Sequence, residues 1–146
     1  MKSVVIYESV YGNTRTIAEA IAAALPGEVK LQNVTGASVA GLEAGDLLVV
    51  GAPTHGGRPT ETTQGFLDQL PANSLAGIRV AGFDTRLTAK WVRIFGYAGP
   101  RIEAALGEKG GTPVGSPGGV FVQGKEGALA NGEVERAAAG ARQVAG

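Results

Sequence analysis

The chain has 146 residues, of which 44% are hydrophobic and 18% are charged. This length and composition are typical of one folded domain with a substantial hydrophobic core and exclude a disordered chain. The 13 basic residues balance the 13 acidic residues, which argues against a general nucleic-acid-binding protein. There is no cysteine and one histidine, so disulfides, thiol catalysis and Cys-rich or His-rich metal sites are excluded.

The sequence contains no run of about 18 apolar residues, which predicts that the chain does not span a membrane. The N-terminus leads directly into a short apolar run without the pattern of a signal peptide, and we therefore expect a cytoplasmic protein. We expect a single domain over residues 1–146, because no internal repeat and no second domain is evident.

Predicted strands and helices alternate along the chain. Short apolar runs bounded by turn residues predict strands, and apolar residues that recur on one face predict helices. In chain order we predict a strand at 3–8, a helix at 14–25, strands at 28–34 and 46–51, a helix at 62–70, a strand at 78–83, a helix starting near Pro100, a strand at 120–122 and a helix at 131–144. A short helical turn is expected at residues 38–42. Five strands with intervening helices predict a parallel, doubly wound α/β sheet.

The segment between the first strand and the first helix has the character of a phosphate site. Backbone N–H groups at the start of a helix lack partners within the helix, and the helix dipole favours an anion there. The segment lacks the lysine of a P-loop and the glycine spacing of a dinucleotide-binding fingerprint. Hydroxyl and amide donors without a cation predict a monophosphate site, and the alternative is an ordinary capped strand-to-helix turn. The residues of this predicted phosphate site are Ser9, Val10, Tyr11, Gly12, Asn13 and Thr14.

The pattern Ser-x-x-Gly-Asn-Thr after the first strand resembles the FMN-phosphate loop of the flavodoxin family. The resemblance covers nearly the whole chain. It implies a flavodoxin-like three-layer sandwich, in which a five-stranded parallel sheet has the order 2-1-3-4-5. A ligand crevice is then expected outside the carboxyl ends of strands one and three. The resemblance thus implies that FMN is the cofactor and that residues 9–14 bind its phosphate.

The segment after the third strand is where members of the family contact the flavin ring. In this chain it contains Pro53, Thr54, His55 and Gly56. The resemblance implies that His55 stacks on the ring or forms a hydrogen bond at its edge. The alternative for His55 is a solvated loop residue.

The segment after the fourth predicted strand contains Asp84, Thr85 and Arg86. The resemblance implies that Asp84 and Thr85 bind the pyrimidine edge of the flavin, and the alternative for Asp84 is a helix cap. Acidic flavodoxins usually have a tyrosine here, stacked on the outer face of the ring. This chain has none at that place, so we expect an open outer face that would suit a second substrate.

Residues 86–101 combine basic and apolar side chains. Arg86, Lys90 and Arg93 have the spacing of one helical face, and Leu87, Trp91, Ile94 and Phe95 form an apolar stripe beside them. Two interpretations stay open. One is an amphipathic helix packed on the sheet, and the other is a docking surface for a nicotinamide cofactor, a quinone or a porphyrin.

The resemblance implies an FMN-binding redox protein that exchanges electrons with a partner protein or with a small-molecule acceptor such as a quinone. The alternatives are an FMN-dependent NAD(P)H:quinone-type oxidoreductase and a flavin-free binding module. No acid–base pair, nucleophile triad or metal cluster stands out, so we expect no catalytic residue and no metal site. Whether the chain is a turnover enzyme stays open. A neutral net charge predicts a less negative hydroquinone potential than that of acidic flavodoxins.

Overall fold

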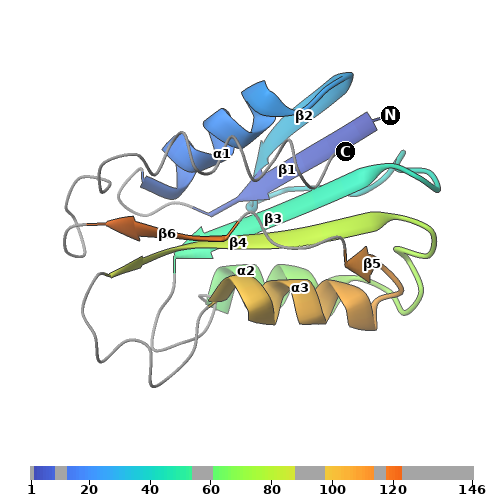
Figure 1. The fold of residues 1–146 in the computed structure, drawn as a ribbon. Helices are drawn as coiled ribbons and strands as arrows, with labels where there is room; N and C mark the ends of the chain where they lie inside the picture. The colour runs from blue at the N-terminus through green and yellow to red at the C-terminus, as the bar shows by residue number, and fades with distance from the viewer. Residues whose placement is uncertain (1, 9–12, 54–60, 88–97, 114–117, 123–146) are drawn as a thin grey trace.

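The computed structural model describes residues 2–8, 13–53, 61–87, 98–113 and 118–122. These residues form a parallel sheet covered by helices on both faces (Figure 1). Most predicted boundaries agree with the observed ones to within one or two residues. The strands are β1 (Lys2–Tyr7), β2 (Glu28–Asn33), β3 (Leu47–Pro53), β4 (Arg79–Leu87), β5 (Thr112–Pro113) and β6 (Gly118–Val122), and the helices are α1 (Asn13–Ala24), α2 (Glu61–Gln69) and α3 (Ala98–Glu108).

The strands of the sheet follow the order β2-β1-β3-β4-β5, and all pairs are parallel. This order confirms the prediction 2-1-3-4-5. The chain moves from β1 to β2 on one side and then to β3 on the other, so the order reverses at β1. Ligands of open parallel sheets bind outside the carboxyl ends of the strands at such a reversal.

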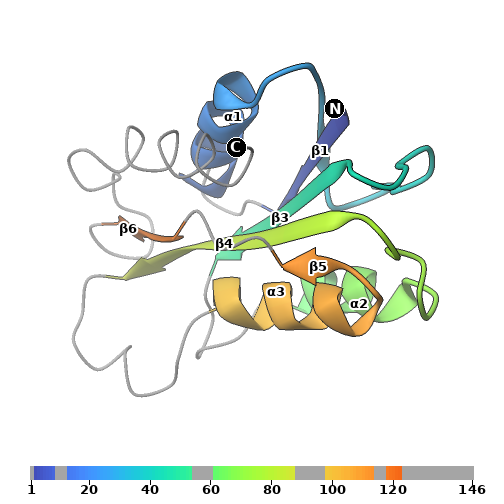
Figure 2. The same ribbon diagram turned by 45° about the vertical axis from the view of Figure 1, so that its right-hand side comes forward.

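The position next to β4 is shared by two segments, which differs from the single predicted strand at 120–122. β5 pairs with the start of β4 at Arg79 and Val80, and β6 pairs with its end, from Phe83 to Leu87. Figure 2 shows β5 and β6 beside opposite ends of β4. The edge position of the sheet is therefore built from two short strands.

β4 continues beyond the predicted end at residue 83, and the prediction of a loop at Asp84, Thr85 and Arg86 was wrong. β6 pairs with all three residues, and the end of β3 pairs with Asp84 and Thr85 on the other side. A second partner strand satisfies backbone groups that a loop would expose. Arg86 and Leu87 are extended, so the helical spacing expected over residues 86–101 does not begin there; residues 88–97 lie outside the described residues.

The expected helical turn at residues 38–42 is also absent. The Leu42 N–H donates to the Val39 carbonyl at 3.3 Å, as in a simple turn. Gly41 has a φ of 89°, which a right-handed helix does not allow. The helix predicted at residues 131–144 lies outside the described residues.

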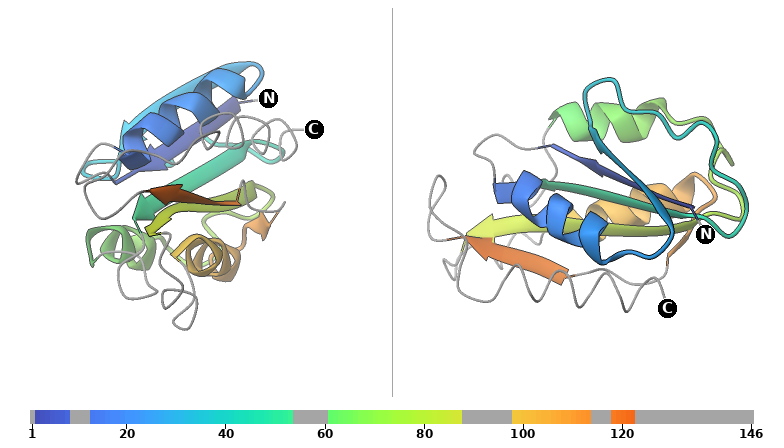
Figure 3. Two further views of the ribbon diagram at one scale, coloured as in Figure 1. Left: turned by 60° about the vertical axis from the view of Figure 1, so that its left-hand side comes forward. Right: turned by 90° about the horizontal axis from the view of Figure 1, so that it is seen from above.

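The core occupies both faces of the sheet, as Figure 3 shows with the sheet between α1 on one side and α2 and α3 on the other. On the α1 face, Ile17 and Ile21 are fully buried against β1, β3 and β4. On the opposite face, Leu67 of α2 and the Ile102 and Leu106 stripe of α3 are buried. Residues 47–50 of β3 are 0% exposed, as expected for a central strand covered on both sides. The helices thus cover both faces of the sheet, so a ligand site is expected at the ends of the strands.

Candidate functional site

β1, β3 and β4 end together at one edge of the sheet, which we call the carboxyl edge. Tyr7 pairs with Gly51, Gly51 pairs with Phe83, and Pro53 at the end of β3 pairs with Thr85. α1 begins at this edge with Asn13, and five residues, 8–12, separate it from Tyr7 at the end of β1. Two of the predicted flavin-binding segments therefore begin where β1 and β3 end at this edge, and the third, residues 84–86, lies in the last part of β4 beside the end of β3.

The structure places six of the predicted site residues. Asn13 and Thr14 form the first turn of α1, and Pro53 is the last residue of β3. The remaining three lie in β4 rather than in a loop, beside the end of β3. The six residues are Asn13, Thr14, Pro53, Asp84, Thr85 and Arg86, whereas Ser9, Val10, Tyr11, Gly12, Thr54, His55 and Gly56 lie outside the described residues.

The first turn of α1 has the properties of an anion site. It contains no acidic residue, so no negative charge within that turn opposes the partial positive charge of the helix start. Ile17, Ala18 and Ile21 are 0% exposed and pack on the sheet, which fixes the helix start at the carboxyl edge. Arg15 is exposed and forms an ion pair with Glu19 at 3.2 Å.

Glu8 follows β1 and contacts two other elements. Its backbone N–H donates to the Gly51 carbonyl of β3 at 3.0 Å. Its carboxylate oxygen Oε1 accepts a hydrogen bond from the Thr63 hydroxyl of α2 at 2.6 Å, a short distance typical of a charge-assisted hydrogen bond. Thr63 is 0% exposed. Local sequence patterns do not predict this pair, because the two residues lie 55 positions apart. The one sequence signal is a carboxylate directly after an apolar strand.

Two buried aromatic residues flank Gly51 near the carboxyl edge. Tyr7, Gly51 and Phe83 are register partners across β1, β3 and β4, and both aromatic side chains belong to the core under α1. A Cβ atom at position 51 would overlap the ring of Phe83. The Phe83 ring therefore requires glycine at this position.

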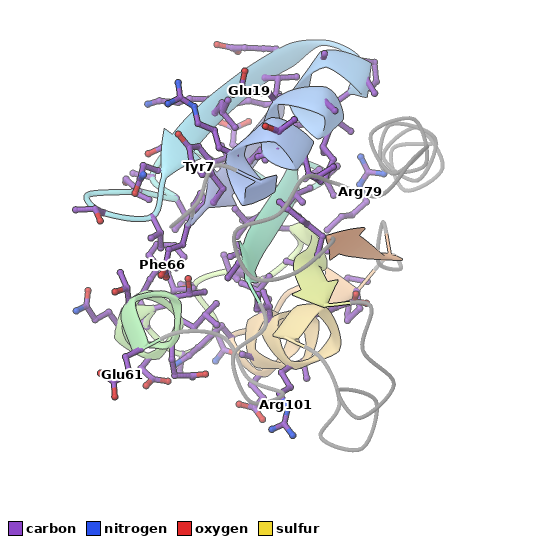
Figure 4. All side chains as sticks on the ribbon, turned by 90° about the vertical axis from the view of Figure 1, so that its left-hand side faces the viewer. Tyr7, Glu19, Glu61, Phe66, Arg79 and Arg101 are labelled. Atoms are coloured by element: carbon purple, nitrogen blue, oxygen red, sulfur yellow. The ribbon has the colours of Figure 1, made fainter. Side chains whose placement is uncertain are left out.

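Two helices place charged side chains near the carboxyl edge. Figure 4 views the molecule from the side on which β3 and β4 end, with Glu61 of α2 and Arg101 of α3 on the outer side of their helices. Both residues are exposed. Among the described residues, no group of three or more acidic, His or Cys residues could hold a metal ion. Within the same part of the chain, no helix is long and apolar enough to cross a membrane.

Among the residues that the structure describes, the one ionisable group with a clear pKa shift lies at the other end of the sheet. Asp46 precedes β3, and its carboxylate accepts the backbone N–H groups of Glu43 at 2.9 Å and Lys2 at 3.1 Å. These hydrogen bonds, led by that of Glu43, lower the pKa of Asp46 below its ordinary value. Because Asp46 lies away from the carboxyl edge, we interpret this shift as structural.

Comparison with known proteins agrees with this geometry. A family model described as a flavodoxin domain matches residues 4–114. A flavodoxin from Maridesulfovibrio salexigens is 38% identical over 89 residues, which cover 56% of this chain and 61% of that protein. The match therefore spans less than two thirds of the length of that relative.

Two solved structures extend the similarity to nearly the whole chain. The oxidised flavodoxin 2 from Bacillus cereus is 30% identical with a TM-score of 0.80, and the match covers 99% of this chain and 98% of that one. A flavodoxin from the domain Archaea has a TM-score of 0.79 at 19% identity, covering 99% and 96% of the two chains, which shows a shared fold. The chain has the flavodoxin-like three-layer fold and belongs to the flavodoxin family.

Proposed function

We propose that this chain binds FMN at the carboxyl edge and passes electrons through the flavin to a redox partner. Family and fold indicate a flavin-binding electron-transfer protein. The observation that supports FMN in particular is the start of α1, whose acid-free first turn is held beside the end of β1 at the reversal of strand order. This arrangement suits a phosphate group.

The chemistry of the chain fits the phosphate end of FMN. Asn13 and Thr14 belong to the first turn of α1, and together with Ser9 and Gly12 they would hold the phosphate through amide and hydroxyl donors. These neutral donors suit a monophosphate better than a polyphosphate, for which a lysine is usual.

The residues proposed for the ring are Pro53, Thr54, His55 and Gly56 after β3 and Asp84, Thr85 and Arg86 in β4. Because β3 and β6 flank Asp84 and Thr85, their backbone groups are less available to a ligand than those of a loop. The proposal therefore depends chiefly on the β1–α1 junction. Bound FMN would supply one- and two-electron chemistry, while the chain binds and orients it.

The first experiment is an absorbance spectrum of the purified protein after incubation with FMN and removal of the excess. We expect visible flavin bands and quenched flavin fluorescence. Thr14→Val, which removes one phosphate donor, should weaken FMN binding about tenfold, or about 1.4 kcal/mol. Thr112→Val is the matched control, because Thr112 is exposed and pairs with Arg79 at the opposite end of β4. A protein that stays colourless and does not bind FMN in a titration would contradict the proposal and favour a flavin-free binding module.

A second candidate is an FMN-dependent NAD(P)H:quinone-type oxidoreductase. The sequence favours this enzyme because residues 84–96 contain no tyrosine. The outer face of the flavin ring would then be open to a substrate. Steady-state oxidation of NADH or NADPH with a quinone by the FMN-loaded protein would support this enzyme. No turnover, combined with rapid reduction of the flavin by a reductase protein, would support the electron carrier.

A further inference from the structure

Glu8 connects three elements at the carboxyl edge. Its backbone N–H is bonded to the Gly51 carbonyl of β3 at 3.0 Å, and its carboxylate is bonded to the Thr63 hydroxyl of α2 at 2.6 Å. The residue itself directly follows β1. A single residue therefore links the exit of β1, the end region of β3 and the first turn of α2.

The Glu8 carboxylate lies where core packing alone would favour an apolar side chain. Val4 and Ile6 of β1 belong to the core shared with α2 and α3, and side chains alternate along a strand, so Glu8 continues this series toward the same face. Glu8 is half-buried and its partner Thr63 is fully buried. Partial burial of a carboxylate is unfavourable unless hydrogen bonds compensate for lost hydration, which indicates that the bond to Thr63 has a role beyond filling space.

The two partners flank the segments that the proposed function assigns to the flavin. Glu8 immediately precedes Ser9, the first residue of the phosphate segment, and Thr63 lies in the first turn of α2, into which the chain leads from Pro53 and His55. We propose that Glu8 is a positioning residue for flavin binding: its hydrogen bond to Thr63 sets the start of α2 relative to the ends of β1 and β3. This inference rests on the proposed function, because it assumes that FMN binds at the carboxyl edge.

The test measures two quantities for each variant, the Kd for FMN from flavin fluorescence and the melting temperature of the FMN-free protein. Thr63→Val removes the donor with little change of shape, and Glu8→Ala removes the acceptor. Each should raise the Kd about tenfold, which corresponds to about 1.4 kcal/mol. The double variant should bind FMN no more weakly than the weaker single variant, because both changes break the same bond.

Conservative variants separate positioning from general stability. Thr63→Ser keeps the hydroxyl and Glu8→Gln keeps an acceptor oxygen, so both should bind FMN within about threefold of the unchanged protein. Thr62→Val is the matched control, since Thr62 is the exposed neighbour in the same turn of α2; its Kd should not change.

Several results would overturn the inference. One is a lower melting temperature of Thr63→Val and Glu8→Ala with an unchanged Kd, because the bond would then serve stability alone. A tenfold change of Kd in Glu8→Gln would also contradict it, since the charge rather than the hydrogen bond would control binding. If the unchanged protein binds FMN and all variants bind equally well, this inference alone fails. If the unchanged protein does not bind FMN, the proposed function fails with it.

Discussion

Replacement of Gly51 by alanine tests the packing that holds β3 and β4 together near the carboxyl edge. A Cβ at position 51 would overlap the Phe83 ring, and Phe83 is 0% exposed. The ring cannot move into solvent, so β3 or β4 must shift to accept one methyl group. We therefore expect Gly51→Ala to destabilise the protein although alanine fits most strands as well as glycine does.

The magnitude follows from the cost of adding atoms to a close-packed core, which is about 1–3 kcal/mol. The overlap with a buried ring places Gly51→Ala toward the upper end, at about 2–3 kcal/mol. For a chain of this size, about 1 kcal/mol corresponds to about 2–4 °C in melting temperature. The expected loss is therefore about 5–10 °C.

Thermal unfolding of the flavin-free protein, followed by circular dichroism, measures this loss. Gly65→Ala is the control: Gly65 lies in α2 and an added Cβ meets nothing within 4 Å, so alanine should be neutral or stabilise by up to about 1 kcal/mol. The change Gly51→Ala should cost less when Phe83 is already leucine, because the smaller side chain leaves room. A melting temperature of Gly51→Ala within about 1 °C of the unchanged protein would refute the reasoning.

Three further predictions concern other parts of the fold. Asp46→Asn should lower stability at neutral pH. The lowered pKa of Asp46 stabilises the fold above its ordinary value of 3.8, and this contribution disappears as the pH falls through the lowered value; melting curves of both proteins should therefore converge in acid. Glu19→Ala removes an exposed ion pair and should change the free energy of unfolding by less than about 0.5 kcal/mol in urea titrations. Leu106→Ala leaves a cavity beneath the sheet and should cost about 2–5 kcal/mol in the same assay.

Much of the fold could be predicted because local hydrophobic patterns indicate which segments form buried strands and helices. The apolar run at residues 47–50 predicts a buried central strand, and those residues are 0% exposed. Ile102 and Leu106, one helical turn apart, predict the buried stripe of α3 and are also fully buried. The strand order did not follow from these patterns. It came from the resemblance of residues 9–14 to a family loop, and the structure confirms it.

The errors arose where partners distant in sequence decide the local structure. Asp84, Thr85 and Arg86 are polar and lack a strand pattern, yet they extend β4 because Gly119, Val120 and Phe121 of β6 pair with them. No local signal in residues 84–86 reports that partner.

The bond between Glu8 and Thr63 has the same origin, since it joins residues brought together only when α2 packs beneath β1. The short helical turn expected at residues 38–42 is absent for a local reason. Gly41 adopts a positive φ, and the sequence around an isolated glycine does not predict that conformation.

The most direct test of the central claim compares FMN with riboflavin, which has the same ring but no phosphate. Fluorescence titrations of the purified protein would give the Kd of each. If the start of α1 binds the phosphate, the charge-assisted hydrogen bonds should make FMN at least about 100-fold tighter, or about 2.7 kcal/mol. Equal affinity for the two flavins, or no binding of either, would contradict a phosphate site at the β1–α1 junction.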